Sequence, residues 1–127
     1  MREETKNWIE QAEADFINAK DSLDNGKYYL SAFLSQQAAE KIVKAAILEI
    51  VKKTPPKTHD IELLCRELKA EENVIKAARN LTPAFILSRY PDIIKIPPVR
   101  FYSKEISTEI YKSAKEVFLW ARKKLRL

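Results

Sequence analysis

The sequence predicts an all-α protein, an up-and-down helical bundle, on three observations. Apolar residues recur at steps of three and four along each long segment. No alternation of polar and apolar residues is long enough for a β-sheet. One glycine against six prolines is poor in β-turn material but suits long helices with short, stiff connections. At 127 residues, we expect one domain spanning residues 1–127.

The first part of the chain predicts a long helical hairpin. From about residue 3 to residue 25, apolar residues at helical spacing define a single face. The pair Asn25-Gly26 marks the end of this helix, because glycine tolerates the left-handed conformation that closes helices. A second helix is expected over residues 28–53. The prolines at 55–56 end it, since proline lacks the N–H donor that a helix needs.

Shorter helices are expected in the middle of the chain. Residues 58–60 offer capping oxygens for a helix over residues 60–69. Acidic residues open the next helix, over residues 71–80, where they suit the positive end of the helix dipole. A threonine followed by a proline predicts an N-cap and first position for a brief helix over residues 82–88.

The last part of the chain predicts a loop followed by a long closing helix. Three prolines exclude a continuous helix over residues 89–103, so we expect an extended, ordered loop there. The final helix is predicted from Ser103 or Lys104 to about Lys124. The expected architecture is therefore a long N-terminal helical hairpin, short middle helices and a long closing helix.

Composition limits the classes of function. The net charge of +5 is not gathered in one basic block, which predicts at most weak attraction to nucleic acid. A single cysteine, Cys65, excludes an intramolecular disulfide and favours a reducing cytoplasm. We expect a soluble protein with no signal peptide and no membrane span. Neither a metal-ligand cluster nor a glycine-rich phosphate loop is present, so we expect no metal and no cofactor.

The second helix is unusual because it is apolar on nearly every side. Tyr29, Phe33, Val43, Ile47 and Val51 form one stripe, and alanines and Ile42 occupy the other sides. Such a helix is normally buried on several sides. We therefore expect it to face the core on one side and a second subunit on another. This predicts a homodimer that uses the second helix or the closing helix.

Polar residues inside this apolar helix call for an explanation. Gln36, Glu40 and Lys44 lie among its apolar positions, and a carboxylate there is costly unless it is paired. In one interpretation Glu40 pairs with Lys44, one turn on, at a surface-facing edge. In the other, Gln36 and Glu40 anchor a buried polar network with a basic partner. Arg89 is then the expected first choice, with Lys44 or Arg79 next.

Several segments together resemble the HEPN domain of bacteria and archaea, and the resemblance runs along nearly the whole chain. The residues that carry it are Trp8, Ala12, Asp15-Phe16, Ala19, Gly26, Tyr28-Tyr29, Gln37-Ala38-Ala39-Glu40-Lys41, Lys44-Ala45, Thr58-His59-Asp60, Leu64, Arg89-Tyr90-Pro91-Asp92 and Trp120. The QAAEK and RYPD segments, in this order, are its most specific part.

The resemblance implies a compact helical bundle that usually dimerises. Such domains are often encoded beside a minimal nucleotidyltransferase, with which they form a two-component system. Several members are toxins that cut RNA, with a catalytic Arg followed a few residues later by a His at a dimer cleft. This chain departs from that pattern, because no His follows Arg89 and the only His is His59. The departure argues against an enzyme, and no catalytic residue is assigned.

The RYPD segment remains a candidate ligand site made of Arg89, Tyr90, Asp92 and Lys95. Arg binds phosphate or carboxylate through two parallel hydrogen bonds, Tyr stacks on a base, and Asp accepts from a base edge. Arg100 and Tyr102 of the same loop could extend a basic, aromatic surface. The structural alternative is an Arg–Asp pair that locks the loop. His59 is interpreted as a capping or locally hydrogen-bonded residue.

Three hypotheses follow. The first, which we favour, is a non-catalytic HEPN-like dimer that binds a nucleotide or nucleic acid and partners a minimal nucleotidyltransferase in a toxin–antitoxin-like system. The second is an active, metal-independent ribonuclease toxin with an atypical site around Arg89 and Asp92. The third is a protein-interaction module whose polar groups are structural. The missing His argues against the second, and the Arg-Tyr loop argues against the third.

Overall fold

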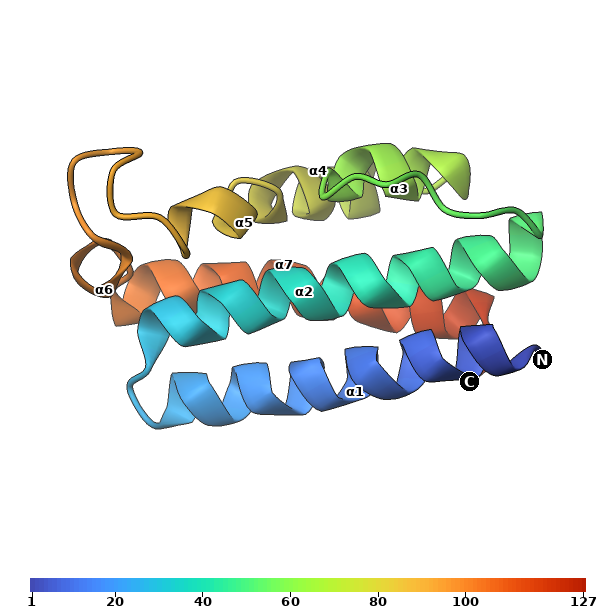
Figure 1. Ribbon diagram of the computed structural model, residues 1–127, viewed down its shortest axis with the longest axis horizontal. Helices are drawn as coiled ribbons and strands as arrows, with labels where there is room; N and C mark the ends of the chain where they lie inside the picture. The colour runs from blue at the N-terminus through green and yellow to red at the C-terminus, as the bar shows by residue number, and fades with distance from the viewer.

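The computed structural model describes all residues 1–127 and confirms the all-α class (Figure 1). Its elements in chain order are α1 (Glu3–Asp24), α2 (Tyr28–Ala46), the π-helical turn η1 (Ile47–Val51), α3 (Ile61–Glu67), α4 (Glu72–Leu81), α5 (Ala84–Leu87), α6 (Pro98–Phe101) and α7 (Lys104–Lys124). The predicted order of long hairpin, short middle helices and long closing helix is the observed one.

The hairpin of α1 and α2 is held by polar side chains as well as by its apolar faces. Lys41 Nζ lies 2.6 Å from Asp15 Oδ2, a buried carboxylate on α1. Ser31 Oγ donates to the Ala19 carbonyl at 2.8 Å. In the turn between the helices Gly26 has φ +75°, a left-handed conformation. The helix end predicted from the Asn25-Gly26 pair is therefore the observed one.

Helix α2 lies at the centre of the molecule and is covered by its own chain. It packs against α1 on one side, α7 on another, and the layer of α3 and α5 on a third. Its alanines and Ile42 are fully buried, whereas Tyr29 and Val51 at its two ends are exposed. The apolar surface that led us to expect a second subunit against α2 is therefore used within one chain. That reason for a dimer was wrong.

The second helix ends differently from the prediction. Its α-helical hydrogen bonding stops at Ala46 and widens into the π turn η1, which the Lys52 N–H closes by donating to the Ile47 carbonyl at 3.1 Å. Lys52 is left-handed, with φ 60°, so the helix is already closed before Pro55.

The middle elements agree with the prediction in position but not in every cap. Asp60 caps α3, since its side chain accepts from the Leu63 N–H at 3.2 Å. Thr82 was expected to cap α5, but it has helical geometry at the end of α4, and its Oγ1 accepts from the Ile61 N–H. Thr82 therefore ties α3 to α4 instead of starting α5.

The loop expected over residues 89–103 contains a short helix that was not predicted. Pro98 opens α6 at the first helical position, where its missing N–H is not needed. Ser103 then caps the closing helix α7, accepting from the Ile106 N–H at 3.2 Å. Helix α7 packs on α2 and α4 and closes the core. No helix combines the length and apolar character that crossing a membrane requires.

Candidate functional site

A buried polar network is built on one face of α2. Gln36, Glu40 and Lys44 follow one another at four-residue steps and are 0%, 4% and 8% exposed. Gln36 Nε2 donates to Glu40 Oε1 at 3.0 Å, and Lys44 Nζ donates to Glu40 Oε2 at 3.1 Å. The ammonium also lies 5.8 Å from the ring centre of Trp8 on α1. Both interpretations thus hold in part, because Glu40 pairs with Lys44 and does so inside the molecule.

The third partner of Glu40 is His59. Its Nδ1 lies 2.9 Å from Glu40 Oε1, and Gln36 Nε2 reaches the His59 carbonyl at 3.4 Å. When the carboxylate is ionised it only accepts hydrogen bonds, so this contact then needs the tautomer with its proton on Nδ1, which leaves Nε2 as an acceptor. The His59 side chain is 51% exposed. The buried carboxylate therefore fixes an imidazole that is half exposed to solvent.

The imidazole of His59 rests on an aromatic ring that also contacts Arg89. The rings of His59 and Phe85 are stacked, with centres 3.6 Å apart. The Arg89 guanidinium carbon lies 4.8 Å from the centre of the same Phe85 ring, 5.2 Å from Phe33 and 5.7 Å from Tyr90. The structure thus brings the only histidine and the arginine of the RYPD segment onto one phenylalanine.

Arg89 was the first-choice partner of Glu40, and this expectation was wrong. Its guanidinium makes no hydrogen bond or ion pair with any carboxylate. Arg79 does not reach Glu40 either, because it forms a two-point pair with Glu62 at 3.0 Å and 3.0 Å. His59 fills the position beside Glu40 that we had assigned to an arginine.

The remaining predicted site residues lie on the loop after α5. Tyr90 is half exposed and touches Arg89, whereas Asp92 and Lys95 are exposed and form no ion pair. An Arg89–Asp92 pair, the structural alternative, is not formed. Tyr102 cannot extend an aromatic surface, since it is only 4% exposed.

Sequence reasoning missed Phe33 and Phe85, which organise this site. We call the set Phe33, His59, Phe85, Arg89 and Tyr90 the Arg89 cluster. No spacing rule connects α2, the segment before α3 and α5, so the sequence carried no signal for their meeting. Only His59 stood out, as the single histidine next to a helix start.

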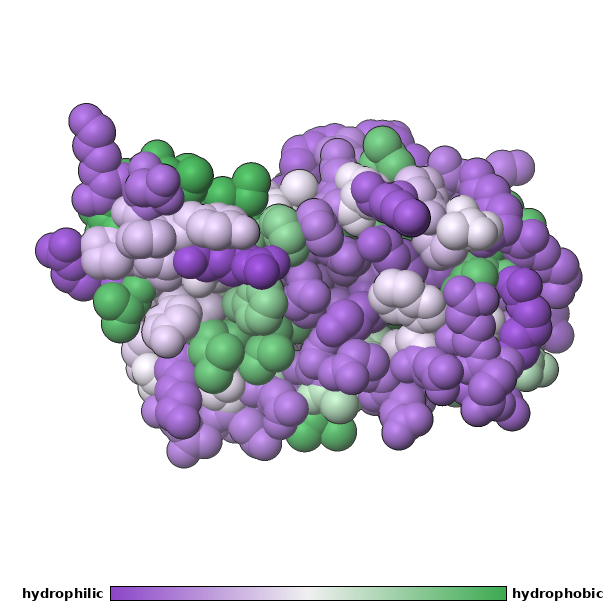
Figure 2. Space-filling view, viewed as in Figure 1, coloured by the Kyte–Doolittle hydropathy of each residue, from purple (hydrophilic) through white to green (hydrophobic).

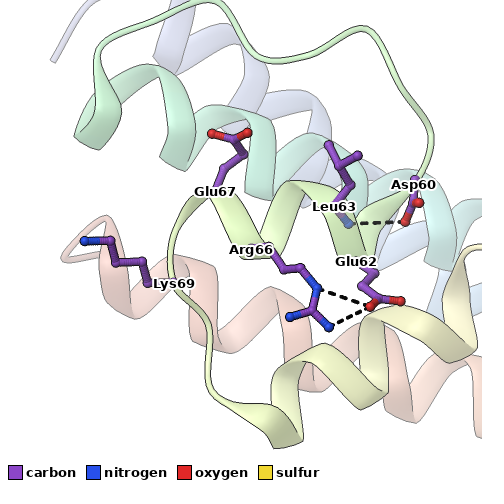
Figure 3. A pocket seen from close by; sticks show the side chains of 6 residues that line it. All are labelled: Asp60, Glu62, Leu63, Arg66, Glu67 and Lys69. Carbon is purple, nitrogen blue, oxygen red and sulfur yellow. Dashed lines mark hydrogen bonds and ion pairs between the residues drawn. The ribbon is translucent and has the colours of Figure 1, made fainter.

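A second concave region lies on the outer face of α3, but most of its charged side chains already have a hydrogen-bond or ion-pair partner and only Lys69 has none (Figure 3). Arg66 donates to Glu62 at 2.8 Å, and Glu67 accepts from Lys53 at 2.8 Å. Flanking Arg79 and Arg66 lower the pKa of the Glu62 carboxyl to about 2. A surface whose ionic groups mostly satisfy one another offers little to a charged ligand, so the Arg89 cluster is the better candidate.

Comparison with known proteins gives the family. The model of the HEPN domain matches residues 5–124. The crystal structure of TT1696 from Thermus thermophilus superposes with a TM-score of 0.87 at 27% identity, covering 97% of this chain and 99% of that one. ST0689, described as an archaeal HEPN homologue, gives 0.81 at 29% identity, covering 97% and 98%.

A third crystal structure, of an HEPN domain protein from Thermotoga maritima, shares the fold with a TM-score of 0.73 at 24% identity. It covers 94% of this chain and 98% of that one. No curated protein is similar enough in sequence to be matched. Since the family model spans nearly all of the 127 residues, the chain belongs to the HEPN domain family.

Proposed function

We propose that this chain is a cytoplasmic HEPN homodimer that binds a nucleotide or single-stranded RNA at the Arg89 cluster. We further propose that it acts with a separately encoded minimal nucleotidyltransferase, as a toxin–antitoxin-like pair. The observation that carries the proposal is the set of contacts that Arg89 makes. Its guanidinium lies over three aromatic rings and has no carboxylate partner.

This arrangement suits a phosphate with an attached base. Cation–π contacts hold the guanidinium in place while leaving its N–H edges free for two parallel hydrogen bonds to phosphate oxygens. The half-exposed ring of Tyr90 is available for stacking on a base. Lys95 adds a second positive charge on the same loop, and Asp92 could accept a hydrogen bond from a base edge.

Apolar surface at the same end of the molecule supports a subunit contact there. Exposed apolar side chains gather on α5, α6 and the loop between them, and Figure 2 shows more apolar surface toward this end of the face in view. Three of them, all isoleucines outside the Arg89 cluster, make up the loop patch: Ile86, Ile93 and Ile96. In the proposed dimer the loop patch is covered by a second copy, so the Arg89 cluster lies beside the interface.

The binding proposal is tested by titrating a short fluorescent single-stranded RNA across salt concentrations. We expect weak, salt-sensitive binding by the wild type. Loss of one phosphate contact in Arg89→Ala should lower the slope of log K against log salt by about 0.7. Arg126→Ala removes the same charge beside the C-terminus, which lies at the end of the bundle away from the loop after α5 (Figure 1), and should leave the slope unchanged. Identical curves for wild type and Arg89→Ala would remove Arg89 from the site and favour a protein-interaction module.

A ribonuclease is the second candidate, because His59 and Arg89 contact the same ring. In that reaction the free Nε2 of His59 takes the proton of a ribose 2′-hydroxyl, and the 2′-oxygen attacks the neighbouring phosphorus. The 5′-oxygen leaves with a proton returned by the imidazolium, giving a 2′,3′-cyclic phosphate. Arg89 would stabilise the phosphorane. We rank this second because one histidine must serve as both base and acid.

The ribonuclease candidate is tested by incubating the same RNA for long periods with a chelator present. We expect no strong cleavage. Cutting that persists in the chelator, ends in a cyclic phosphate and is abolished by both His59→Gln and Arg89→Ala would promote this candidate above simple binding.

The partnership is tested separately, by asking whether a minimal nucleotidyltransferase encoded beside this chain copurifies with it. Failure to copurify would remove the two-component part of the proposal.

A further inference from the structure

A pocket separate from the Arg89 cluster lies where the turn between α1 and α2 meets α6. Its volume is about 440 Å³, and it is lined by Gly26, residues 27–30, Val99 and Tyr102. Figure 1 shows the α1–α2 turn and α6 at the same end of the bundle. No residue of the Arg89 cluster lines it.

The first turn of α2, whose residues line this pocket, contains unpaired donors. The N–H groups of Tyr28, Tyr29 and Leu30 have no protein acceptor, and Lys27 at the N-cap position supplies none. No acidic residue lies in this turn, although acidic residues commonly offset the positive end of a helix. A helix of 19 residues therefore begins with its positive end uncompensated.

Tyr102 points to a ligand independently of the helix. Its side chain lines the pocket and is only 4% exposed. Burial alone raises its pKa to about 12, and its hydroxyl makes no hydrogen bond with the protein. The phenol therefore stays protonated at ordinary pH, and its hydroxyl is a donor without an acceptor in the protein.

The lining contains donors and apolar surface but no carboxylate. Lys27 forms no ion pair, so its ammonium adds to the positive potential of the helix end. Val99, Leu30 and the tyrosine rings supply the apolar part. We propose that this pocket binds a small organic anion, a phosphate monoester or a carboxylate attached to a compact aromatic group.

The test is an NMR titration of the full chain that follows the backbone amides of residues 28–30. Phenyl phosphate and benzoate separate the two kinds of anion, inorganic phosphate lacks the aromatic group, and benzyl alcohol lacks the charge. We expect saturable shifts with at least one aromatic anion, at least about tenfold weaker binding of inorganic phosphate, and no saturation with benzyl alcohol. Equal binding of inorganic phosphate or of benzyl alcohol would overturn the proposed ligand chemistry.

Two variants assign the binding to this pocket. Tyr102→Phe keeps the ring and removes only the donor, so we expect about 2- to 10-fold weaker binding. Lys27→Asp places a carboxylate where it competes for the same N–H groups, and Asp is a favoured N-cap residue, so the chain should stay folded while binding is lost. Arg89→Ala should bind like the wild type, which separates this proposal from the proposed function. No saturable shift with either aromatic anion up to about 10 mM, or unchanged binding in Lys27→Asp, would overturn it.

Discussion

At the scale of single residues, Glu40 shows how a charge is kept inside an apolar helix. Its two oxygens are contacted by Gln36, Lys44 and His59, so each hydrogen bond offsets part of the cost of removing the carboxylate from water. The network also links α2 to the segment before α3, because His59 belongs to that segment. Glu40 is therefore both a local ion-pair partner and a connection between distant parts of the chain.

This connection predicts a large effect on stability. Glu40→Ala leaves a buried ammonium and an imidazole without their acceptor, and we expect the free energy of unfolding to fall by about 3–5 kcal/mol. Urea denaturation with circular dichroism measures the change. Glu10→Ala is the control, since Glu10 is exposed and forms no ion pair, and it should change the value by less than about 0.5 kcal/mol. Similar small effects in both variants would show that the network contributes little.

Part of this site could be predicted from the sequence, and the limit has a physical cause. Gln36, Glu40 and Lys44 are neighbours because they share a helix, and helical spacing alone reveals that. His59, Phe85 and Arg89 meet only through packing of separate elements, which no periodicity encodes. Charge alone therefore favoured Arg89 as the partner of Glu40. His59, which is one of its observed partners, was predicted to be a capping or locally hydrogen-bonded residue.

At the scale of elements, this chain with one glycine closes several of its helices with other residues in the left-handed conformation. After α3, Ala70 N–H donates to the Cys65 carbonyl at 3.2 Å and Lys69 N–H to the Arg66 carbonyl at 3.0 Å. These two bonds form a Schellman motif, which usually has glycine at the left-handed position. Here Lys69 occupies it, with φ 56°. The approximate extents of the long helices followed from their apolar stripes, but a left-handed closure at a residue other than glycine leaves no signal in the sequence.

A paired substitution measures the strain at this helix end. Lys69→Gly removes the clash of a side chain in left-handed geometry, and we expect about 1 kcal/mol of added stability. The same change at Lys76, exposed in the middle of α4, should cost about 1 kcal/mol, because glycine is a poor helix former. Urea denaturation of both variants gives the two values. Destabilisation by both would mean that Lys69 is not strained.

At the scale of the whole molecule, α2 is covered by its own chain, so we expect the subunit contact at the loop patch instead. We expect light scattering at micromolar concentration to give about twice the chain mass of 14.7 kDa. Replacing Ile93 and Ile96 together by Glu should shift the mass to that of one chain, because two charges would be buried at the interface. Leu119→Glu is the control, since Leu119 on α7 is 51% exposed and Ile93 is 52% exposed. A monomeric wild type would end the dimer proposal.

Alkaline pH should weaken the whole fold through Cys65, which lies at the centre of the core. Burial raises the pKa of its thiol from 9.0 to about 12. Between these values the unfolded chain releases the proton while the folded chain keeps it, so the free energy of unfolding falls as pH rises. The loss is about 1.4 kcal/mol per pH unit above pH 9, and the contribution is fully present below pH 9. Urea denaturation between about pH 8 and 11, with a reductant present, should therefore show a shallower decline for Cys65→Ala than for wild type. Parallel declines would show that Cys65 ionises inside the fold as readily as in the unfolded chain.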